Sequence, residues 1–302
     1  MGRKLGRKII IFVVAVTAIQ VFTFQHYNTL LGGSSSSGGV IAIPSGQTST
    51  TSATSVAKQV SALKQRYKFV TVSGNNQFVA YLDSQNVLHV VQLSNGATLS
   101  TAANAFPVQY VGWIRNDSLF VGEQAAPGKL VLKTVESNTG VQRVVQTFAG
   151  LDASASFKTI AYSALTNDVY ILIGTSSTSV VYHFNTNSDL SVVDLGGRFI
   201  KNIALTQTGN ILYFEDHAAG SFNVLYRQNG SVNLISLNAA LIAVVNRTLY
   251  YGTVNQNGLV TAVYKEDNLS GTKTLVQTLT QPALAASIRV DNNGAISIGS
   301  NT

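Results

Sequence analysis

The stretch that decides the fold reads Tyr67-Lys-Phe-Val-Thr-Val72, Ser73-Gly-Asn-Asn76, Gln77-Phe-Val-Ala-Tyr-Leu82, Val87-Leu-His-Val-Val-Gln-Leu93 and Asn95-Gly-Ala-Thr-Leu-Ser100. Its apolar segments have the length of ordinary β-strands. Several of them alternate polar and apolar residues, as half-buried antiparallel strands do. Asn, Asp, Gly and Ser separate the segments, and these residues favour turns. The stretch therefore predicts four short antiparallel strands joined by tight turns.

The same pattern of four strands returns four more times, and a sixth cycle stops halfway. The expected cycles span residues 67–100, 108–148, 159–194, 200–237, 241–279 and 286–298. Their first turns lie at Asn76, Asn116, Asn167, Gly209, Asn246 and Asn293, so the turns recur every 37 to 51 residues. Four-stranded units at this period are typical of a β-propeller. The sequence thus predicts an all-β fold, a six-bladed β-propeller.

The second strand of several cycles shares an apolar and aromatic pattern. It reads Phe78-Val-Ala-Tyr81, Leu119-Phe-Val121, Val169-Tyr-Ile-Leu172, Ile211-Leu-Tyr-Phe214 and Leu249-Tyr-Tyr251. Together with the Asn- or Gly-led turns, this pattern resembles the TolB-like and WD40-like families of six-bladed β-propellers over residues 67–302. The resemblance implies an architecture. It implies no ligand and no reaction, because propellers host many unrelated functions.

The half cycle at the end would leave two strands with an open sheet edge, which favours aggregation. We therefore expect an N-terminal segment to complete the sixth blade by pairing with residues 295–298. The segments available for this role are residues 40–43 and 56–63. The apolar side chains of the second segment also recur at helical spacing, so a short amphipathic helix over residues 56–66 is its other interpretation.

The N-terminal leader predicts a membrane anchor. Arg3, Lys4, Arg7 and Lys8 precede residues 9–31, which contain no Lys, Arg, Asp or Glu. A helix of this length can cross a bilayer, and the basic flank places the N-terminus in the cytoplasm and the remainder outside. We expect an uncleaved signal-anchor at the cell membrane. A cleaved signal peptide and a type IV pilin-like leader processed at Gly6 are the alternatives.

The domain organisation follows from these segments. Residues 1–31 are expected to form a cytoplasmic stub and a single transmembrane helix. Residues 32–57 are rich in Gly, Ser and Thr, a composition typical of flexible linkers. Residues 58–302 are expected to form an extracytoplasmic propeller.

Composition excludes two classes of function. The net charge is +7, but four of the 20 Lys and Arg residues lie in the leader, which leaves 16 against 13 carboxylates. Without a basic cluster, the sequence predicts no nucleic-acid partner. The chain contains no cysteine, so thiol catalysis and thiolate metal sites are excluded.

The densest group of ionisable residues is Glu215-Asp216-His217, at the end of a predicted second strand. Two carboxylates and an imidazole are possible metal ligands, and calcium would be favoured by the oxygen ligands. Adjacent residues in a hairpin point to opposite faces, so a solvated loop is the alternative interpretation. No other cofactor is expected.

No motif indicates catalysis. The sequence has no Gly-x-Ser-x-Gly elbow, and His89 and His183 occupy third strands at comparable positions, as ordinary strand residues do. A glycosidase needs two carboxylates that face each other within about 5–10 Å. The carboxylates near predicted turns fall in no recognisable catalytic frame; they are Asp83, Glu123, Asp152, Asp168, Asp216 and Asp291.

These observations favour recognition over chemistry. A rigid propeller holds many loops in one frame, so we expect a binding or scaffolding module for a protein or a cell-surface polysaccharide. One alternative is a hydrolase or lyase that acts on envelope glycans. Another is a subunit of a surface assembly or filament.

Overall fold

The computed structural model describes residues 50–186, 188–218, 220–291 and 293–299. The chain divides into the units Met1–Ser49 and Thr50–Thr302, and the described residues belong to the second unit. The predicted anchor over residues 9–31 and most of the predicted linker lie outside the described residues. Within the described residues, no helix has the length and apolar character needed to cross a membrane.

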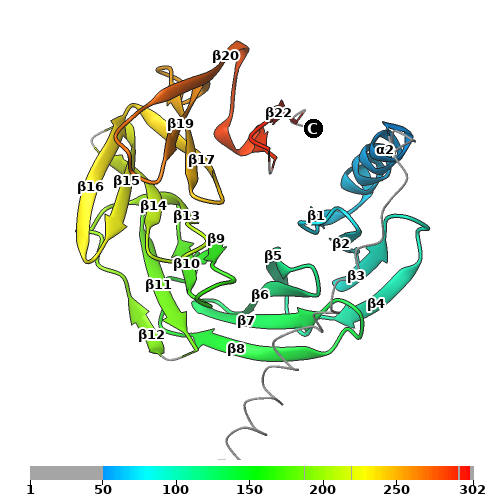
Figure 1. The fold of residues 1–302 in the computed structure, drawn as a ribbon. Coiled ribbons are helices and arrows are strands. Elements are labelled where there is room, and N and C mark those ends of the chain that lie inside the picture. The colour runs from blue at the N-terminus through cyan, green and yellow to red at the C-terminus, as the bar shows by residue number, and fades with distance from the viewer. Residues whose placement is uncertain (1–49, 187, 219, 292, 300–302) are drawn as a thin grey trace, which may run out of the picture. The chain divides into compact units, whose positions relative to one another are not determined.

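The second unit begins with helix α2 (Thr50–Arg66), and its strands form five four-stranded sheets and one two-stranded sheet, which we call blades 1 to 6 (Figure 1). Blade 1 contains β1 (Lys68–Val72), β2 (Phe78–Leu82), β3 (Val87–Gln92) and β4 (Thr98–Ala103). Blade 2 contains β5 (Val108–Arg115), β6 (Ser118–Ala126), β7 (Lys129–Glu136) and β8 (Gln142–Phe148). Blade 3 contains β9 (Ser156–Tyr162), β10 (Val169–Gly174), β11 (Ser179–Asn185) and β12 (Ser188–Val192).

Blade 4 contains β13 (Ile200–Leu205), β14 (Leu212–Ala218), β15 (Ser221–Gln228) and β16 (Ser231–Leu237). Blade 5 contains β17 (Ala239–Val245), β18 (Thr248–Val254), β19 (Val260–Asp267) and β20 (Thr274–Ala283). The short helix η1 (Ala285–Ser287) leads into blade 6, which contains β21 (Ile288–Val290) and β22 (Ile296–Ile298). In every sheet the strands pair in sequence order, which confirms the predicted all-β chain of four-stranded units.

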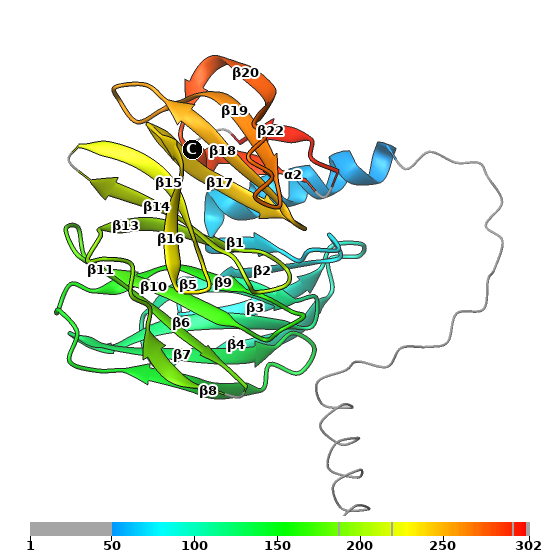
Figure 2. The same ribbon diagram turned by 60° about the vertical axis from the view of Figure 1, so that its left-hand side comes forward.

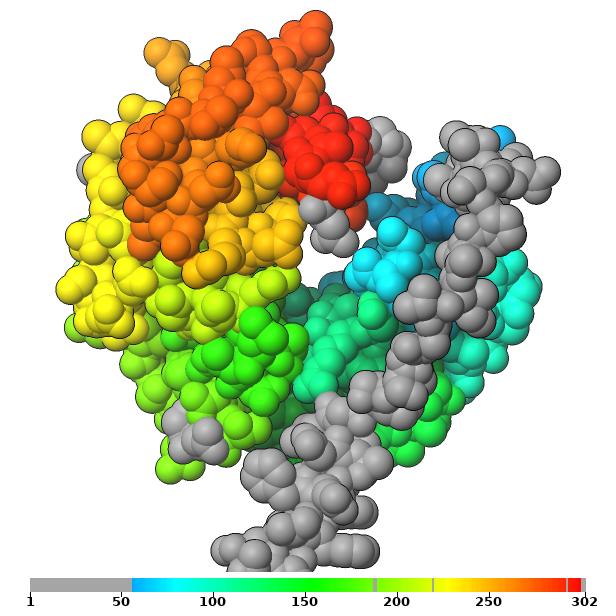
Figure 3. Space-filling model, viewed as in Figure 1, coloured from blue at the N-terminus to red at the C-terminus, as the bar shows by residue number. Residues whose placement is uncertain are grey.

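The blades are arranged around a centre that is open in the space-filling view (Figures 1 and 3). Several turns between first and second strands have the backbone conformation that their sequence predicts. Asn76, Asn167 and Asn246 have φ values of 56°, 56° and 58°, and Gly209 has a φ of 69°. Asn tolerates this left-handed region better than most residues, because its short polar side chain can bond locally.

The hydrophobic core is divided among the contacts between neighbouring blades. Leu88 of β3 and Val121 of β6, both fully buried, share a cluster between blades 1 and 2. Equivalent clusters lie between the later pairs of blades. Blades 2 to 5 therefore bury both faces, and their outermost strands carry most of the exposed positions, as in β16 and β20.

Polar contacts about one repeat apart join the inner strands. Trp113 Nε1 in β5 donates to the carbonyl of Thr71 in β1 at 3.2 Å. Thr159 Oγ1 in β9 donates to Asn202 Oδ1 in β13 at 3.1 Å, and Asn202 Nδ2 donates to the carbonyl of Leu241 in β17 at 3.4 Å. These bonds fix the register between blades as well as their spacing.

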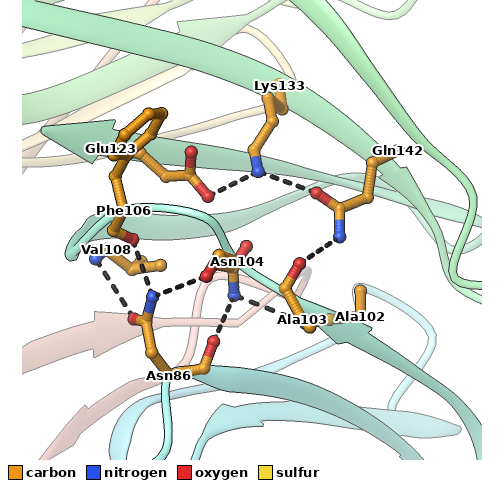
Figure 4. Close-up of polar contacts among 9 residues, drawn as sticks. All are labelled: Asn86, Ala102, Ala103, Asn104, Phe106, Val108, Glu123, Lys133 and Gln142. Atoms are coloured by element: carbon orange, nitrogen blue, oxygen red, sulfur yellow. Dashed lines mark hydrogen bonds and ion pairs between the residues drawn. The ribbon is translucent and has the colours of Figure 1, made fainter. Parts of the chain in front are cut away.

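A buried ion pair lies between blades 1 and 2 (Figure 4). The Lys133 ammonium pairs with the Glu123 carboxylate, and their side chains are only 8% and 1% exposed. Lys133 Nζ also donates to Gln142 Oε1 at 2.7 Å, and Gln142 Nε2 donates to the carbonyl of Ala103 in blade 1 at 2.7 Å. The network thus connects the buried charges of blade 2 to the backbone of blade 1.

The sixth cycle shows one correction to the sequence analysis. Residues 56–63 form no strand, because they lie inside α2. Val56, Val60 and Leu63 recur on one face of this helix and are half-buried, so the helical interpretation is confirmed and the helix extends back to Thr50. Residues 40–43, the other expected donor, lie outside the described residues.

Candidate functional site

The structure does not bring Glu215, Asp216 and His217 together as a metal site. The three residues lie inside β14 rather than in a loop, because the hairpin with β15 continues to Ala218. Successive side chains in a strand point to opposite faces. Across the described part of the chain, no group of three or more His, Asp or Glu side chains is placed to hold a metal ion.

Each of the three side chains has a different partner. Glu215 Oε2 accepts the backbone N–H of Leu241 in blade 5 at 2.9 Å. Asp216 accepts hydrogen bonds from Arg198 Nη1 at 2.8 Å and from Asn223 Nδ2 at 2.9 Å. The His217 ring packs on Phe222, with 4.7 Å between ring centroids. The two buried carboxylates therefore hold neighbouring structure in place.

Glu215 is a carboxylate with a perturbed pKa, but its geometry is not that of a general acid. Burial raises the pKa of Glu215, while the Leu241 N–H and the charge of Lys201 oppose the rise. The carboxylate is 7% exposed and faces the backbone of the next blade. Its raised pKa follows from its position in the core.

The other carboxylates that the sequence singled out also have structural partners. Asp83 Oδ1 accepts the N–H groups of Gln85 and Val87 at 2.9 Å each. Asp152 and Asp291 accept backbone N–H groups within their own turns in the same way. Together with the Glu123–Lys133 pair, these contacts show carboxylates that stabilise turns and blade contacts, with no pair of them facing a shared substrate position.

His89 and His183 each form a pair with a carboxylate. His89 Nε2 lies 2.8 Å from Asp83 Oδ2, and His183 Nε2 lies 2.7 Å from Asp168 Oδ1. Asp83 follows the second strand of blade 1, whereas Asp168 precedes the second strand of blade 3. The two pairs therefore lie at opposite ends of their blades and cannot form one site.

Blade 6 is the place where the architecture departs from its own repeat. The second strands of blades 1 to 5 have a neighbouring strand on both sides, whereas β22 pairs only with β21 within the described residues. Asp291 fixes this hairpin by accepting the N–H groups of Asn293 and Ala295 at 2.9 and 2.8 Å. One edge of β22 therefore has no partner among the described residues, in a hairpin that is locally well formed.

The hairpin is attached to blade 5. Ile288 is 5% exposed and belongs to a cluster with Tyr250 and Val260 of blade 5. Gly294, with a φ of +82°, lies so close that a Cβ added there would be 2.5 Å from the Tyr250 hydroxyl. The opposite face carries Arg289 and Ser297, which pair with each other and are both exposed. Ile298 pairs with Ile288 on the first face and is 47% exposed.

Helix α2 packs on blade 1, whereas the β21–β22 hairpin packs on blade 5. We call the region between blades 5 and 1, which the hairpin only partly fills, the sixth position. Tyr67, directly after the helix, stacks on Tyr81 of β2 with ring centroids 4.3 Å apart. The helix lies on the side of the ring that holds the β21–β22 hairpin (Figures 1 and 2). Its last turn carries Lys64 and Arg66.

The elements on either side of the unfinished sixth blade each carry a cation, Lys64 in α2 and Arg289 in β21. Partial burial and the positive charge of Arg289 in β21 lower the pKa of Lys64 in α2. No described carboxylate lies within ion-pair distance of either residue. This pair has no signal in the sequence because 225 positions separate its members, although the unfinished sixth cycle indicates the region where they lie.

The sequence matches no protein-family model and no curated protein. Solved structures are nevertheless similar to it. TolB from Acinetobacter baumannii is 13% identical with a TM-score of 0.50, over 71% of this chain and 55% of that chain. A putative TolB from Agrobacterium tumefaciens is 12% identical with a TM-score of 0.49, over 76% and 87% of the two chains. A nidogen/laminin complex is 11% identical with a TM-score of 0.48, over 71% and 78%.

The likeness to TolB from Acinetobacter baumannii shows the fold. It confirms the resemblance to TolB-like propellers that the repeats predict. At this identity the likeness carries no information about ligands or partners.

Proposed function

We propose that this protein is a membrane-anchored binding module that recognises an extended segment of a partner protein at the free edge of β22. The single observation that carries the proposal is that no described strand pairs with the outer edge of β22, where blades 1 to 5 have a third strand. An extended peptide adds to such an edge through main-chain hydrogen bonds, while pockets for alternate side chains provide specificity.

The other blades indicate which side chains the partner segment would present. Third strands bury apolar residues at alternating positions, for example Leu88 and Val90 in β3 and Leu130 and Leu132 in β7. A segment in the corresponding place of blade 6 would meet the exposed Ile298. Lys64 and Arg289 favour an acidic residue beside the apolar ones. The partner segment is therefore an extended strand of alternating apolar residues with a carboxylate.

The membrane anchor belongs to this proposal. The basic and then apolar leader supports a single-pass helix over residues 9–31 with a cytoplasmic N-terminus. The Gly/Ser/Thr-rich residues 32–57 would then include a tether that lets the propeller reach a partner on the outer side of the membrane. Such an arrangement suits recognition near the membrane surface.

The alternative of a glycan hydrolase or lyase is less well supported. Retaining and inverting glycosidases use two carboxylates on either side of the scissile bond. The carboxylates described above accept hydrogen bonds within turns or between blades, so they are already engaged. The geometry therefore favours binding.

A peptide probe tests the proposal on the full chain in detergent micelles. The probe is a nine-residue peptide that alternates valine with threonine and carries two glutamates in place of threonines. We expect it to slow hydrogen exchange at residues 296–298, because new main-chain hydrogen bonds protect amides at the edge. A peptide with proline at its centre should protect them far less, since proline has no N–H to donate.

Charge variants make the test specific. Replacement Arg289→Gln together with Lys64→Gln should weaken protection by the glutamate peptide, whereas Lys129→Gln, at an exposed lysine of blade 2, should leave it unchanged. Equal protection by the proline peptide, or none by either peptide, would refute the proposal.

The rival occupant of the edge is the chain's own segment 40–43. Because the chain has no cysteine, the double variant Ile41→Cys and Ser297→Cys reports this pairing cleanly. A disulfide that forms rapidly within one chain would show that the edge is closed from inside. Recognition of a partner strand at β22 would then be wrong.

A further inference from the structure

A pocket of about 410 Å³ lies between blades 3 and 4. One wall is the turn between β10 and β11, with Thr175, Ser176 and Thr178. The other wall comes from the start of β13 and from β14, with Phe199 and His217. This volume falls in the range of small-molecule sites, and the pocket is separate from the sixth position.

The pocket walls are fixed by hydrogen bonds. Thr175 Oγ1 accepts the N–H groups of Ser177 and Thr178 at 3.1 and 3.0 Å, which holds the turn in shape. Ser179 Oγ accepts the N–H of Ile200 in blade 4 at 2.6 Å, so its hydroxyl proton is available to another acceptor. A Cβ added at Gly174 would lie 2.6 Å from the Thr178 carbonyl oxygen, so only glycine fits this tight turn.

All charged residues that line the pocket are basic. Lys158 and Lys201 enter from β9 and β13, and no Asp or Glu is among the lining residues. Neither lysine forms an ion pair within the described residues. Lys201 Nζ lies 4.4 Å from the centroid of the Phe222 ring, which also packs on His217. This cation–π contact holds the ammonium group in place.

The two carboxylates that precede His217 in the sequence are not among the residues that line the pocket. Asp216 is fully buried and paired with Arg198 at 2.8 Å. Glu215 accepts the Leu241 N–H on the side of blade 5, although its charge interacts with Lys201. The pocket therefore presents two lysines, several hydroxyl groups and one aromatic face to solvent.

From this lining we propose that the pocket binds an anionic sugar residue of a glycan. The lysine ammonium groups would bind the phosphate, sulfate or carboxylate of the sugar through charge-assisted hydrogen bonds. The hydroxyls of Ser176 and Ser179 would bond to sugar hydroxyls, and Phe199 would cover an apolar face of the ring. The site therefore has groups that bind an oxyanion beside groups that bind sugar hydroxyls.

Calorimetric titration of the full chain in detergent micelles tests this assignment with four ligands. Glucose 6-phosphate and glucuronate are the anionic sugars, glucose is the neutral sugar and inorganic phosphate is the anion without a sugar. We expect both anionic sugars to bind, and glucose to bind about tenfold more weakly or worse, because it lacks the charge-assisted bonds.

Variants locate the binding. Replacement of Lys158 and Lys201 by glutamine should abolish binding of the anionic sugars, whereas Lys129→Gln should leave their affinity unchanged. Both lysines are exposed at the pocket, so the fold should persist, and fluorescence of Trp113, the single tryptophan, checks this. A lysine-to-arginine change at either position should retain binding.

Three results would overturn the assignment. The first is equal affinity for glucose and the anionic sugars, and the second is binding that survives the double variant. The third is absence of binding by all four ligands at tens of millimolar. Equal affinity for inorganic phosphate and glucose 6-phosphate would reject the sugar and reduce the site to an oxyanion site.

Discussion

The ionised form of the Asp168 carboxylate is stabilised by hydrogen bonds from neighbouring side chains. Burial acts to raise the pKa of Asp168, but hydrogen bonds from Thr166, His183 and Asn185 outweigh it and lower the pKa below the ordinary value of an aspartate. A lowered carboxyl pKa stabilises the fold at pH above the unfolded value, and this stabilisation is lost as the pH falls through the folded value.

Replacement Asp168→Asn should therefore reduce stability in a pH-dependent way. At pH 7 we expect a loss of about 1 kcal/mol in the free energy of unfolding, the usual contribution of such hydrogen bonds. The difference from the unaltered chain should begin to shrink below about pH 4, where the carboxyl of the unfolded chain binds a proton, and should disappear as the pH falls through the lower pKa of the folded state. Urea unfolding at pH 7 and pH 3 measures both values, and a difference that is constant with pH would contradict the expectation.

The buried pair Glu123–Lys133 has a larger expected effect. Replacement Lys133→Met leaves the Glu123 carboxylate buried without its cation, which should cost about 3–5 kcal/mol. The double replacement Glu123→Leu and Lys133→Met removes both charges and should restore most of the loss. Unfolding followed by the fluorescence of Trp113 at the same blade contact measures the three free energies. A double variant as unstable as Lys133→Met would contradict this account.

Single residues differ in how far the sequence could predict their roles. Asn at the start of a turn was predictable, because the preference of Asn for left-handed backbone is local. The presence of Lys158 and Lys201 in one pocket was not predictable, because 43 positions separate them and only the contact between blades 3 and 4 brings them together. Long-range neighbours of this kind depend on the register between sheets.

At the scale of elements, Asn76 tests the turn that joins β1 to β2. Its φ is 56° and its side chain is exposed. Asn76→Gly should change the free energy of unfolding by no more than a few tenths of a kcal/mol, because glycine reaches this region freely. Asn76→Val should cost about 1–3 kcal/mol, since a β-branched residue is strained there. Thermal unfolding of the two variants, compared with Gln77→Val beside the turn, isolates the backbone effect.

The sequence predicted the presence of the strands more accurately than the residues at which they end. The second strand of blade 4 was expected to stop at Phe214, but β14 continues to Ala218 because His217 and Ala218 pair with Phe222 and Ser221. This extension is the reason that Glu215, Asp216 and His217 alternate across a sheet instead of sharing a loop. Helix α2 likewise begins before the predicted residue 56, where apolar periodicity is absent.

At the scale of the whole molecule, periodicity predicted the blades but not how the ring closes. Contacts between neighbouring blades repeat along the chain, so one cycle indicates the next. The sixth blade has no such precedent, because its hairpin packs on blade 5 while a helix from the start of the described chain packs on blade 1. The same break in the repeat leaves one edge of β22 without a described partner strand, and the proposed recognition depends on this edge.

The membrane anchor is tested on the whole molecule. If residues 9–31 span the membrane, the full chain should remain in the membrane fraction after carbonate extraction, and deletion of these residues should release it.

Orientation follows from single cysteines in the cysteine-free chain. Ser297→Cys should react with a membrane-impermeant maleimide added to intact cells, whereas Gly2→Cys should react only after lysis, because the basic flank stays in the cytoplasm. The intact mass distinguishes the alternatives, since a cleaved signal peptide or a leader processed at Gly6 would remove the Gly2→Cys site. Labelling of Gly2→Cys in intact cells would refute the orientation, and with it an outward-facing propeller.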